Sequence, residues 1–208
     1  MVYDNMKFSL EYIVPPEQNF RGLSYGDWAS VFWNWLLSDL EQRGSVYFLR
    51  GNVDLEAPIV RTEGETVTIY SDVGIFFPII CTVTSRLDHP KAISDIMRRK
   101  QSAESERTPL ALRAVIDNIE IPNPENYYAE TPEFILSVPK SYPLRKQFEP
   151  RFRTGKAPAV SAGYWILMKP FPIGEHTIKF EGADRDGFKT SGIYTITVVE
   201  RPIVSTYV

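Results

Sequence analysis

The side chains best suited to catalysis or metal binding are few in this sequence and lie far apart. It has two histidines, His89 and His176, and one cysteine, Cys81. His89 precedes a proline at an expected helix entrance, and His176 falls in a predicted strand, so neither has the spacing of a zinc ligand set. No nucleophile elbow, phosphate-binding loop or dinucleotide fingerprint occurs. We therefore expect a protein that is not an enzyme and that needs no cofactor or metal.

One short acidic segment resembles the opening of a calcium loop. The segment "ADRDGF" contains Asp184, Asp186 and Gly187. A calcium loop of this kind also needs a bidentate carboxylate further along the chain, and that residue is missing. Asp and Gly are also typical turn residues, so the segment predicts a polar turn between two strands.

A cluster of basic residues stands out in an otherwise acidic chain, between Lys140 and Lys156. Six Lys or Arg residues occur there against one acidic residue, Glu149, and aromatic residues are interleaved with them. This basic arm has two interpretations: a solvated loop, or a surface that docks on an acidic partner, where Arg and aromatic residues are favoured anchors. The candidate partner-binding residues are Arg145, Lys146, Phe148, Arg151, Phe152 and Arg153.

Composition and charge bound the class of protein. The chain has 208 residues, 43% hydrophobic and 24% charged, which suits a single globular domain spanning 1–208. The formal net charge of −3 argues against general binding of nucleic acid or of an anionic membrane. The first residues contain scattered charges and no long apolar stretch, so we expect neither a signal peptide nor a membrane anchor. A single cysteine excludes an intrachain disulfide.

Three of the four tryptophans lie in one stretch, "SYGDWASVFWNWLLSDL". Ser24 and Asp27 form a capping box that predicts a helix start. An apolar stripe follows at helical spacing, with Trp33 and Leu37 widening it. Its members are Trp28, Val31, Phe32, Trp35, Leu36 and Leu40. We expect Trp28 and Trp35 to be buried between this helix and a β-sheet, although some indoles could instead line a sugar or partner site. Asn34, polar within the apolar run, needs a hydrogen-bond partner.

The remaining chain is mostly β in pattern. The expected strands are 7–14, 45–52, 66–71, 74–85, 133–139, 163–171, 174–183 and 192–200, several of them with alternating apolar residues. Residues 88–120 have helical spacing and predict a helical insertion. Residues 121–158 are rich in proline and predict an irregular arm that contains the basic cluster. The predicted fold is mainly β: an antiparallel β-sandwich, immunoglobulin-like or jelly-roll-like, with a buried Trp-rich N-terminal helix.

Several segments carry a resemblance to a known group of proteins. The signature is Y-G-[DE]-W followed by W-x-W, here Tyr25-Gly26-Asp27-Trp28 and Trp33-Asn34-Trp35. It continues with "GSVYFLRGN", "GIFFPII" and "GYWILMKPFPIGEHTIKFEG". The chain resembles a poorly characterised family of marine cyanophages that has relatives among secreted bacterial proteins. Those relatives carry signal peptides, whereas we expect none in this chain, so the resemblance implies a virion component made in the host cytoplasm.

Two main functional hypotheses follow, and a hydrolase with an unfamiliar active-site geometry stays open as a third. The first is a non-enzymatic phage virion structural protein, a homo-oligomeric capsid decoration or tail-attached component that docks on other virion proteins. The second is a carbohydrate-binding module that recognises host surface glycans. In that case Tyr127, Tyr128, Tyr142 or Trp165 could stack on sugar rings.

Overall fold

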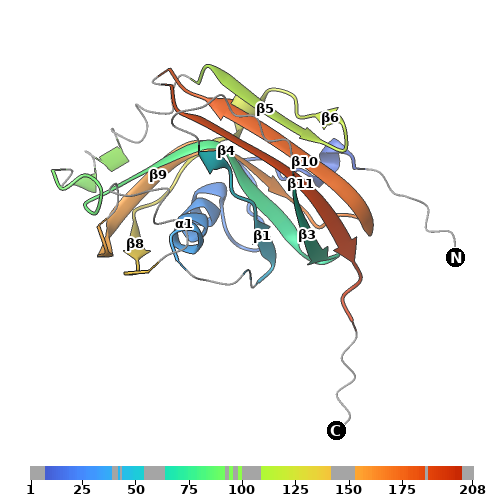
Figure 1. Ribbon diagram of the computed structural model, residues 1–208, viewed down its shortest axis with the longest axis horizontal. Coiled ribbons are helices and arrows are strands. Elements are labelled where there is room, and N and C mark those ends of the chain that lie inside the picture. The colour runs from blue at the N-terminus through green and yellow to red at the C-terminus, as the bar shows by residue number, and fades with distance from the viewer. Residues whose placement is uncertain are drawn as a thin grey trace, which may run out of the picture.

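The computed structural model describes residues 8–38, 42, 44–53, 64–91, 94–95, 98–99, 109–141, 153–185 and 187–202. Within them the chain forms three layers: one helix and two β-sheets (Figure 1). The helical elements are the 3₁₀ turns η1 (Leu10–Tyr12) and η2 (Pro124–Tyr127) and the helix α1 (Tyr25–Leu36). The strands are β1 (Val46–Phe48), β2 (Asn52–Val53), β3 (Glu65–Tyr70), β4 (Gly74–Ser85), β5 (Ala111–Ile116), β6 (Ile119–Glu120), β7 (Tyr128–Glu130), β8 (Phe134–Val138), β9 (Gly155–Met168), β10 (Gly174–Ala183) and β11 (Lys189–Val199).

The two sheets have mixed strand directions. The first sheet has the order β1-β4-β9-β7, and β8 also pairs with β9. The second has the order β2-β11-β10-β5-β6, and β3 also pairs with β11. Most pairs are antiparallel, but β1 runs parallel to β4 and β3 runs parallel to β11. The predicted mainly β sandwich with a Trp-rich helix is therefore confirmed, and two parallel pairs make its otherwise antiparallel sheets mixed.

The first sheet is buried on both faces because it is the middle layer. On β4, Ile75 and Phe77 face the second sheet, and Phe76 between them faces α1. On β9, Ile166 faces the second sheet and Trp165 faces α1. This position explains why the central strands read as near-continuous apolar runs rather than as alternating ones.

The helix α1 is fixed to the sheet by aromatic packing and by hydrogen bonds. Its capping box forms as predicted, with the Asp27 amide donating to Ser24 Oγ (3.2 Å) and the Ser24 amide donating to the Asp27 carboxylate (3.0 Å). Trp33 is buried, and its Nε1 donates to Ser161 Oγ on β9 at 2.7 Å. The Tyr25 hydroxyl, also buried, donates to Val14 O (2.5 Å). The Trp-rich stretch is thus a core layer.

The buried face of α1 differs from the predicted stripe. Trp28 and Phe32 are buried as expected, but Val31 is 42% exposed and Trp35 is only half-buried. Trp33 is the second buried indole. The helix is turned relative to the expected orientation because Trp33 reaches the polar Ser161 on β9, whereas Trp35 packs on Phe32 and Phe48 at the margin. Leu40 lies outside the described residues.

The second half of the predicted helical insertion is a β-hairpin. Residues 111–116 form β5, which pairs with β10 and turns back into β6. Asp117 and Asn118 both have positive φ, the conformation of a tight two-residue hairpin turn. Ala114 and Ile116 point into the core with period two. The helical prediction failed because Leu112 and Ile116, four residues apart, share one face of a helix and also one face of a strand, and pairing with β10 decides between the two.

Three other segments differ in part from the secondary structure expected of them. In the first half of the insertion, Asp95, Arg98 and Arg99 are helical and Ser94 lies in a bend, while residues 92–93, 96–97 and 100–108 lie outside the described residues. The expected strand 7–14 is instead the 3₁₀ turn η1 followed by a single bridge from Ile13 to Met168. Within the proline-rich region, the expected strand 133–139 is confirmed as β8, and β7 and the start of β9 add strand that was not expected.

Candidate functional site

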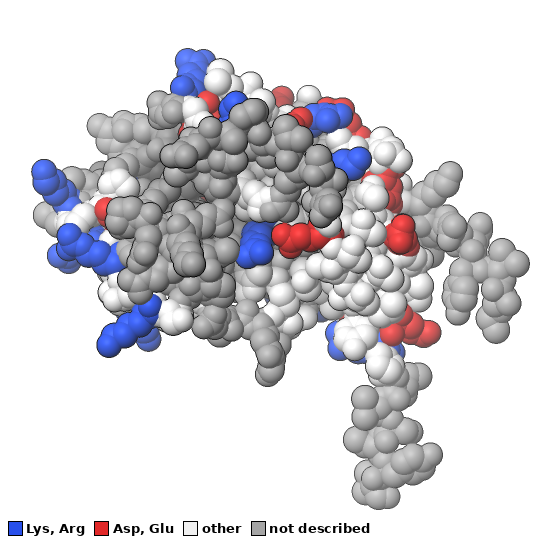
Figure 2. Space-filling view, viewed as in Figure 1, with Lys and Arg blue, Asp and Glu red and all other residues white. Residues whose placement is uncertain are grey.

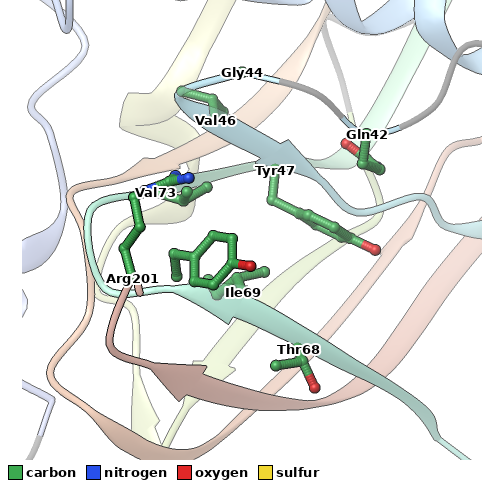
Figure 3. Close-up of a pocket in the computed structure, with 9 residues that line it drawn as sticks. Gln42, Gly44, Val46, Tyr47, Thr68, Ile69, Val73 and Arg201 are labelled. Carbon is green, nitrogen blue, oxygen red and sulfur yellow. The ribbon is translucent and has the colours of Figure 1, made fainter. Parts of the chain in front are cut away.

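A cleft of about 330 Å³ lies where the two sheets meet at one edge of the sandwich. One wall is β1 of the first sheet and the other is β3 of the second, and Figure 3 shows Tyr47 and Thr68 bordering the same space. Each strand pairs on one side, β1 with β4 and β3 with β11. We call this space the edge cleft.

The lining of the edge cleft combines an apolar floor with polar and aromatic sides. Val46, Ile69 and Val73 line it and are buried. Tyr47 is half-buried, and Tyr70 is 37% exposed. Because apolar surface lies beside ring faces, the cleft is suited to a ligand that has its own apolar face.

The charged groups at the edge cleft are paired. Arg201 Nε lies 2.9 and 3.0 Å from the two carboxylate oxygens of Asp72, and its guanidinium lies 4.4 Å from the centre of the Tyr70 ring. This hydrogen bond lowers the pKa of Asp72 below its ordinary value. Arg50 and Glu65, which do not line the cleft but act on Tyr47, form an ion pair at 3.8 Å. The one guanidinium among the residues that line the cleft is therefore already paired with a carboxylate.

The Tyr47 hydroxyl stays protonated at neutral pH. Burial raises the pKa of Tyr47, and the negative charge of Glu65 raises it further, while Arg50 partly offsets both. A protonated phenol both donates and accepts hydrogen bonds. Thr68, an exposed residue of β3, adds a second hydroxyl to the lining.

Gln42 ties the rim of the edge cleft to β1. Its Oε1 accepts from the Phe48 amide at 3.1 Å, and its Nε2 donates to Phe48 O at 2.7 Å. Both Phe48 groups lie on the side of β1 away from β4, because β4 bonds to Ser45 O and the Leu49 amide instead. In Figure 3, Gln42 and Arg201 stand on opposite sides of the cleft.

The two histidines belong to separate pairs with carboxylates. His89 Nδ1 lies 2.8 Å from Asp88 Oδ2. His176 Nδ1 lies 2.6 Å from Asp117 Oδ2, and its Nε2 lies 2.9 Å from Pro172 O. Burial lowers the pKa of His176, but the hydrogen bonds to Asp117 and Pro172 outweigh burial and raise that pKa above its ordinary value. Among the described residues, no three His, Cys, Asp or Glu side chains gather as a metal site.

The predicted calcium-like segment is a turn, as far as it is described. The Asp184 carboxylate accepts from the Phe188 amide at 2.8 Å, and the Asp184 amide donates to Phe188 O at 3.0 Å. Asp186 lies outside the described residues. Asp184 therefore closes the loop between β10 and β11.

Most of the predicted partner-binding residues cannot be placed. Arg145, Lys146, Phe148, Arg151 and Phe152 lie outside the described residues. Arg153 is described: it is exposed, and its backbone amide donates to Leu87 O at 3.0 Å. Lys156 is also exposed and pairs in register with Ser137 of β8.

The aromatic residues predicted to stack on sugars differ in how far they are buried. Trp165 is fully buried and stacks on Phe76 with ring centres 5.2 Å apart, so the expectation that it stacks on a sugar is wrong. Tyr127 is partly buried against both cores, and Tyr128 packs on the Tyr164 ring. Tyr142 lies outside the described residues.

The residues of the edge cleft were missed by sequence reasoning. Tyr47 and Tyr70 lie in strands of different sheets, and nothing in their spacing brings them together. The one available signal was in β3, whose alternation of polar and apolar residues is typical of a strand with one face in solvent.

Comparisons with protein-family models, with curated proteins and with solved structures give no match to this chain. No helix in the described part of the chain combines the length and hydropathy needed to cross a membrane.

Proposed function

We propose that the protein is a non-enzymatic virion component of a bacteriophage, a homo-oligomer that decorates the capsid or attaches to the tail by docking on other virion proteins. The observation that supports this proposal is a basic end of the sandwich. Arg86, Arg153 and Lys156 are exposed there. They belong together because the Arg153 amide donates to Leu87 O and because the ends of β4 and β9 pair in register, Ser85 with Ala159.

This basic end is continuous with the predicted basic arm, which starts and finishes at it. Figure 2 shows Lys and Arg side chains gathered at the left end of the molecule, where β8 and β9 lie in Figure 1. In a protein of net charge −3, a local basic end favours docking on an acidic partner surface.

The polar groups described elsewhere support a scaffold rather than a catalyst. The carboxylate of Asp27 caps a helix, that of Asp88 accepts from the Ser85 amide, and that of Asp117 accepts from the Thr177 amide. These three carboxylates therefore hold a turn or a helix end.

The test has two stages. Quantitative mass spectrometry of purified virions should find the protein at a fixed copy number per particle, and its absence from virions contradicts the proposal. The double variant Arg153→Glu with Lys156→Glu should then weaken attachment to protein-depleted virions. Raised salt should weaken wild-type attachment too, because exposed charges are screened within about 10 Å at 0.1 M salt.

The matched control reverses two charges on the second sheet. Lys179 and Lys189 are also exposed, on β10 and β11. Lys179→Glu with Lys189→Glu makes the same change in net charge away from the basic end. If both double variants attach equally well or equally poorly, the basic end is not the docking surface.

A further inference from the structure

We infer that the edge cleft binds a neutral saccharide, held between Tyr47 of β1 and Tyr70 of β3. This site is separate from the basic end, and it adds recognition of a glycan to the docking role proposed above. It also replaces the aromatic residues that sequence reasoning assigned to sugar stacking.

The size of the edge cleft fits a small ligand. Its volume of about 330 Å³ is at the lower end of the range of about 300–1,000 Å³ found for small-molecule sites. Thr68 and Tyr70 are exposed, so the cleft opens to solvent, and a sugar that is part of a longer glycan can enter it.

The chemistry of the lining matches the two-sided nature of a sugar ring. A pyranose has an apolar C–H face and a rim of hydroxyl groups. The Tyr47 ring and the buried side chains of Val46 and Ile69 offer apolar surface to the C–H face of the sugar. The hydroxyls of Tyr47 and Thr68 can each donate and accept, as the rim requires.

The charge pairs indicate that the saccharide is neutral. The carboxylate of Asp72 already accepts the Nε–H of Arg201, and Glu65 pairs with Arg50. An acidic sugar would have to compete with these carboxylates for each guanidinium. A neutral sugar needs only hydrogen bonds, and it leaves both ion pairs in place.

Two side chains of the cleft are held in place before any ligand arrives. The Gln42 amide is fixed by its two bonds to Phe48, and one of its amide hydrogens is left over for a ligand because Nε2 carries two. Tyr70 is held by the guanidinium of Arg201 at 4.4 Å. Side chains already ordered lose less conformational entropy on binding.

The inference is tested with the full chain on an array of oligosaccharides. Half of the array carries neutral hexoses and N-acetylhexosamines, and half carries uronic or sialic acids. We expect binding to neutral members, followed by titration calorimetry with the tightest of them. Tyr47→Ala and Tyr70→Ala should each weaken that binding about tenfold, the effect of losing one aromatic contact.

Matched variants separate binding from folding. Thr66 and Thr68 lie on the same exposed face of β3, but only Thr68 lines the cleft. Thr68→Val should weaken binding, and Thr66→Val should leave it unchanged. If Tyr47→Ala fails to fold, Tyr47→Phe keeps the ring and removes only the hydroxyl, and it should still weaken binding.

Three results overturn the inference: no binding to any array member, binding to acidic sugars alone, or binding that ignores every cleft variant. None of these results bears on the virion proposal, which depends on mass spectrometry of particles and on the variants of the basic end.

Discussion

The outer edge of β8 and the outer edge of β3 differ in what meets their backbone groups. Along β8, the Asn34 side chain accepts from the Ser137 amide at 3.0 Å and donates to Ile135 O at 3.1 Å. Along β3, strand pairing within the described part of the chain occurs only with β11. One edge is closed by a side chain of α1, and the other borders a cleft.

The outer edge of β1 resembles that of β8. Gln42 accepts from the Phe48 amide and donates to Phe48 O, as a residue of a neighbouring strand would. A carboxamide carries one carbonyl and one NH₂ group, so it can satisfy the same donor and acceptor that a peptide group would. At these residues the outer edges of β1 and β8 are thus protected from pairing with another chain, which exposed strand edges otherwise invite.

The comparison indicates which edge residues contribute to the stability of the fold and which are available to bind a ligand. The closed edges involve residues that hold α1 and β1 in place, so changes there should alter folding. The open edge at β3 carries exposed side chains, so changes there should alter binding. The predictions below separate the two edges, from the largest expected effect to the smallest.

The largest effect is expected where α1, the helix that carries Asn34, is anchored. Trp33→Ala removes a buried indole and its bond to Ser161, and it should lower the free energy of unfolding by about 3–5 kcal/mol. Trp35→Ala, the matched change at a half-buried indole of the same helix, should cost about 1–2 kcal/mol less. Urea denaturation measures both. Equal losses would mean that the exposure of the two indoles does not set their contribution.

The closed edge of β8 can be opened without removing an aromatic residue. Asn34→Leu keeps the size of the side chain but leaves Ile135 O and the Ser137 amide without their partner, which should cost about 1–3 kcal/mol. The opened edge should also promote concentration-dependent self-association in light scattering. Ser30→Ala is the control, because Ser30 bonds only within α1, to Gly26 O. If Asn34→Leu stays as stable and as soluble as the wild type, the amide does not close this edge.

A third contact holds the β5–β6 hairpin to the start of β10, and it should depend on pH. His176 has a pKa raised above 6.5 in the folded protein, so its contribution to stability is fully present below about pH 6.5 and is lost as the pH rises through the folded pKa. The melting temperature should therefore fall over this range. In Asp117→Asn, which removes the carboxylate partner, this dependence should be weaker. An unchanged slope in the variant would show that His176 does not titrate against Asp117.

The sequence predicted the elements whose patterns are local. The capping box of Ser24 and Asp27 forms, and β10 alternates as expected, with Ile178 and Phe180 buried on one face. A cap depends on neighbouring residues, and a half-buried strand records its burial at every second residue. These signals can be read without knowing the partner elements.

The remaining features depend on pairing between distant segments. Leu112 and Ile116 share a face in a helix and also in a strand, and only the pairing of β5 with β10 selects the strand. The edge cleft exists because β1 joins one sheet and β3 joins the other. No local sequence pattern indicates the pairing of β5 with β10 or the placement of β1 and β3 in different sheets. Tyr47 and Tyr70 therefore could not be assigned to one site from the sequence.

The smallest effect on stability is expected at the open edge. Thr68 is exposed on β3, and valine keeps the β-branched shape that strands favour, so Thr68→Val should change the free energy of unfolding by no more than about 0.5 kcal/mol. In urea denaturation, the free energy of unfolding of Thr68→Val should be close to that of Thr66→Val and well above that of Asn34→Leu. A loss as large as that of Asn34→Leu would mean that Thr68 makes a stabilising contact. The edge of β3 would then be closed like that of β8, and the edge cleft would be part of the packing rather than a surface free to bind a ligand.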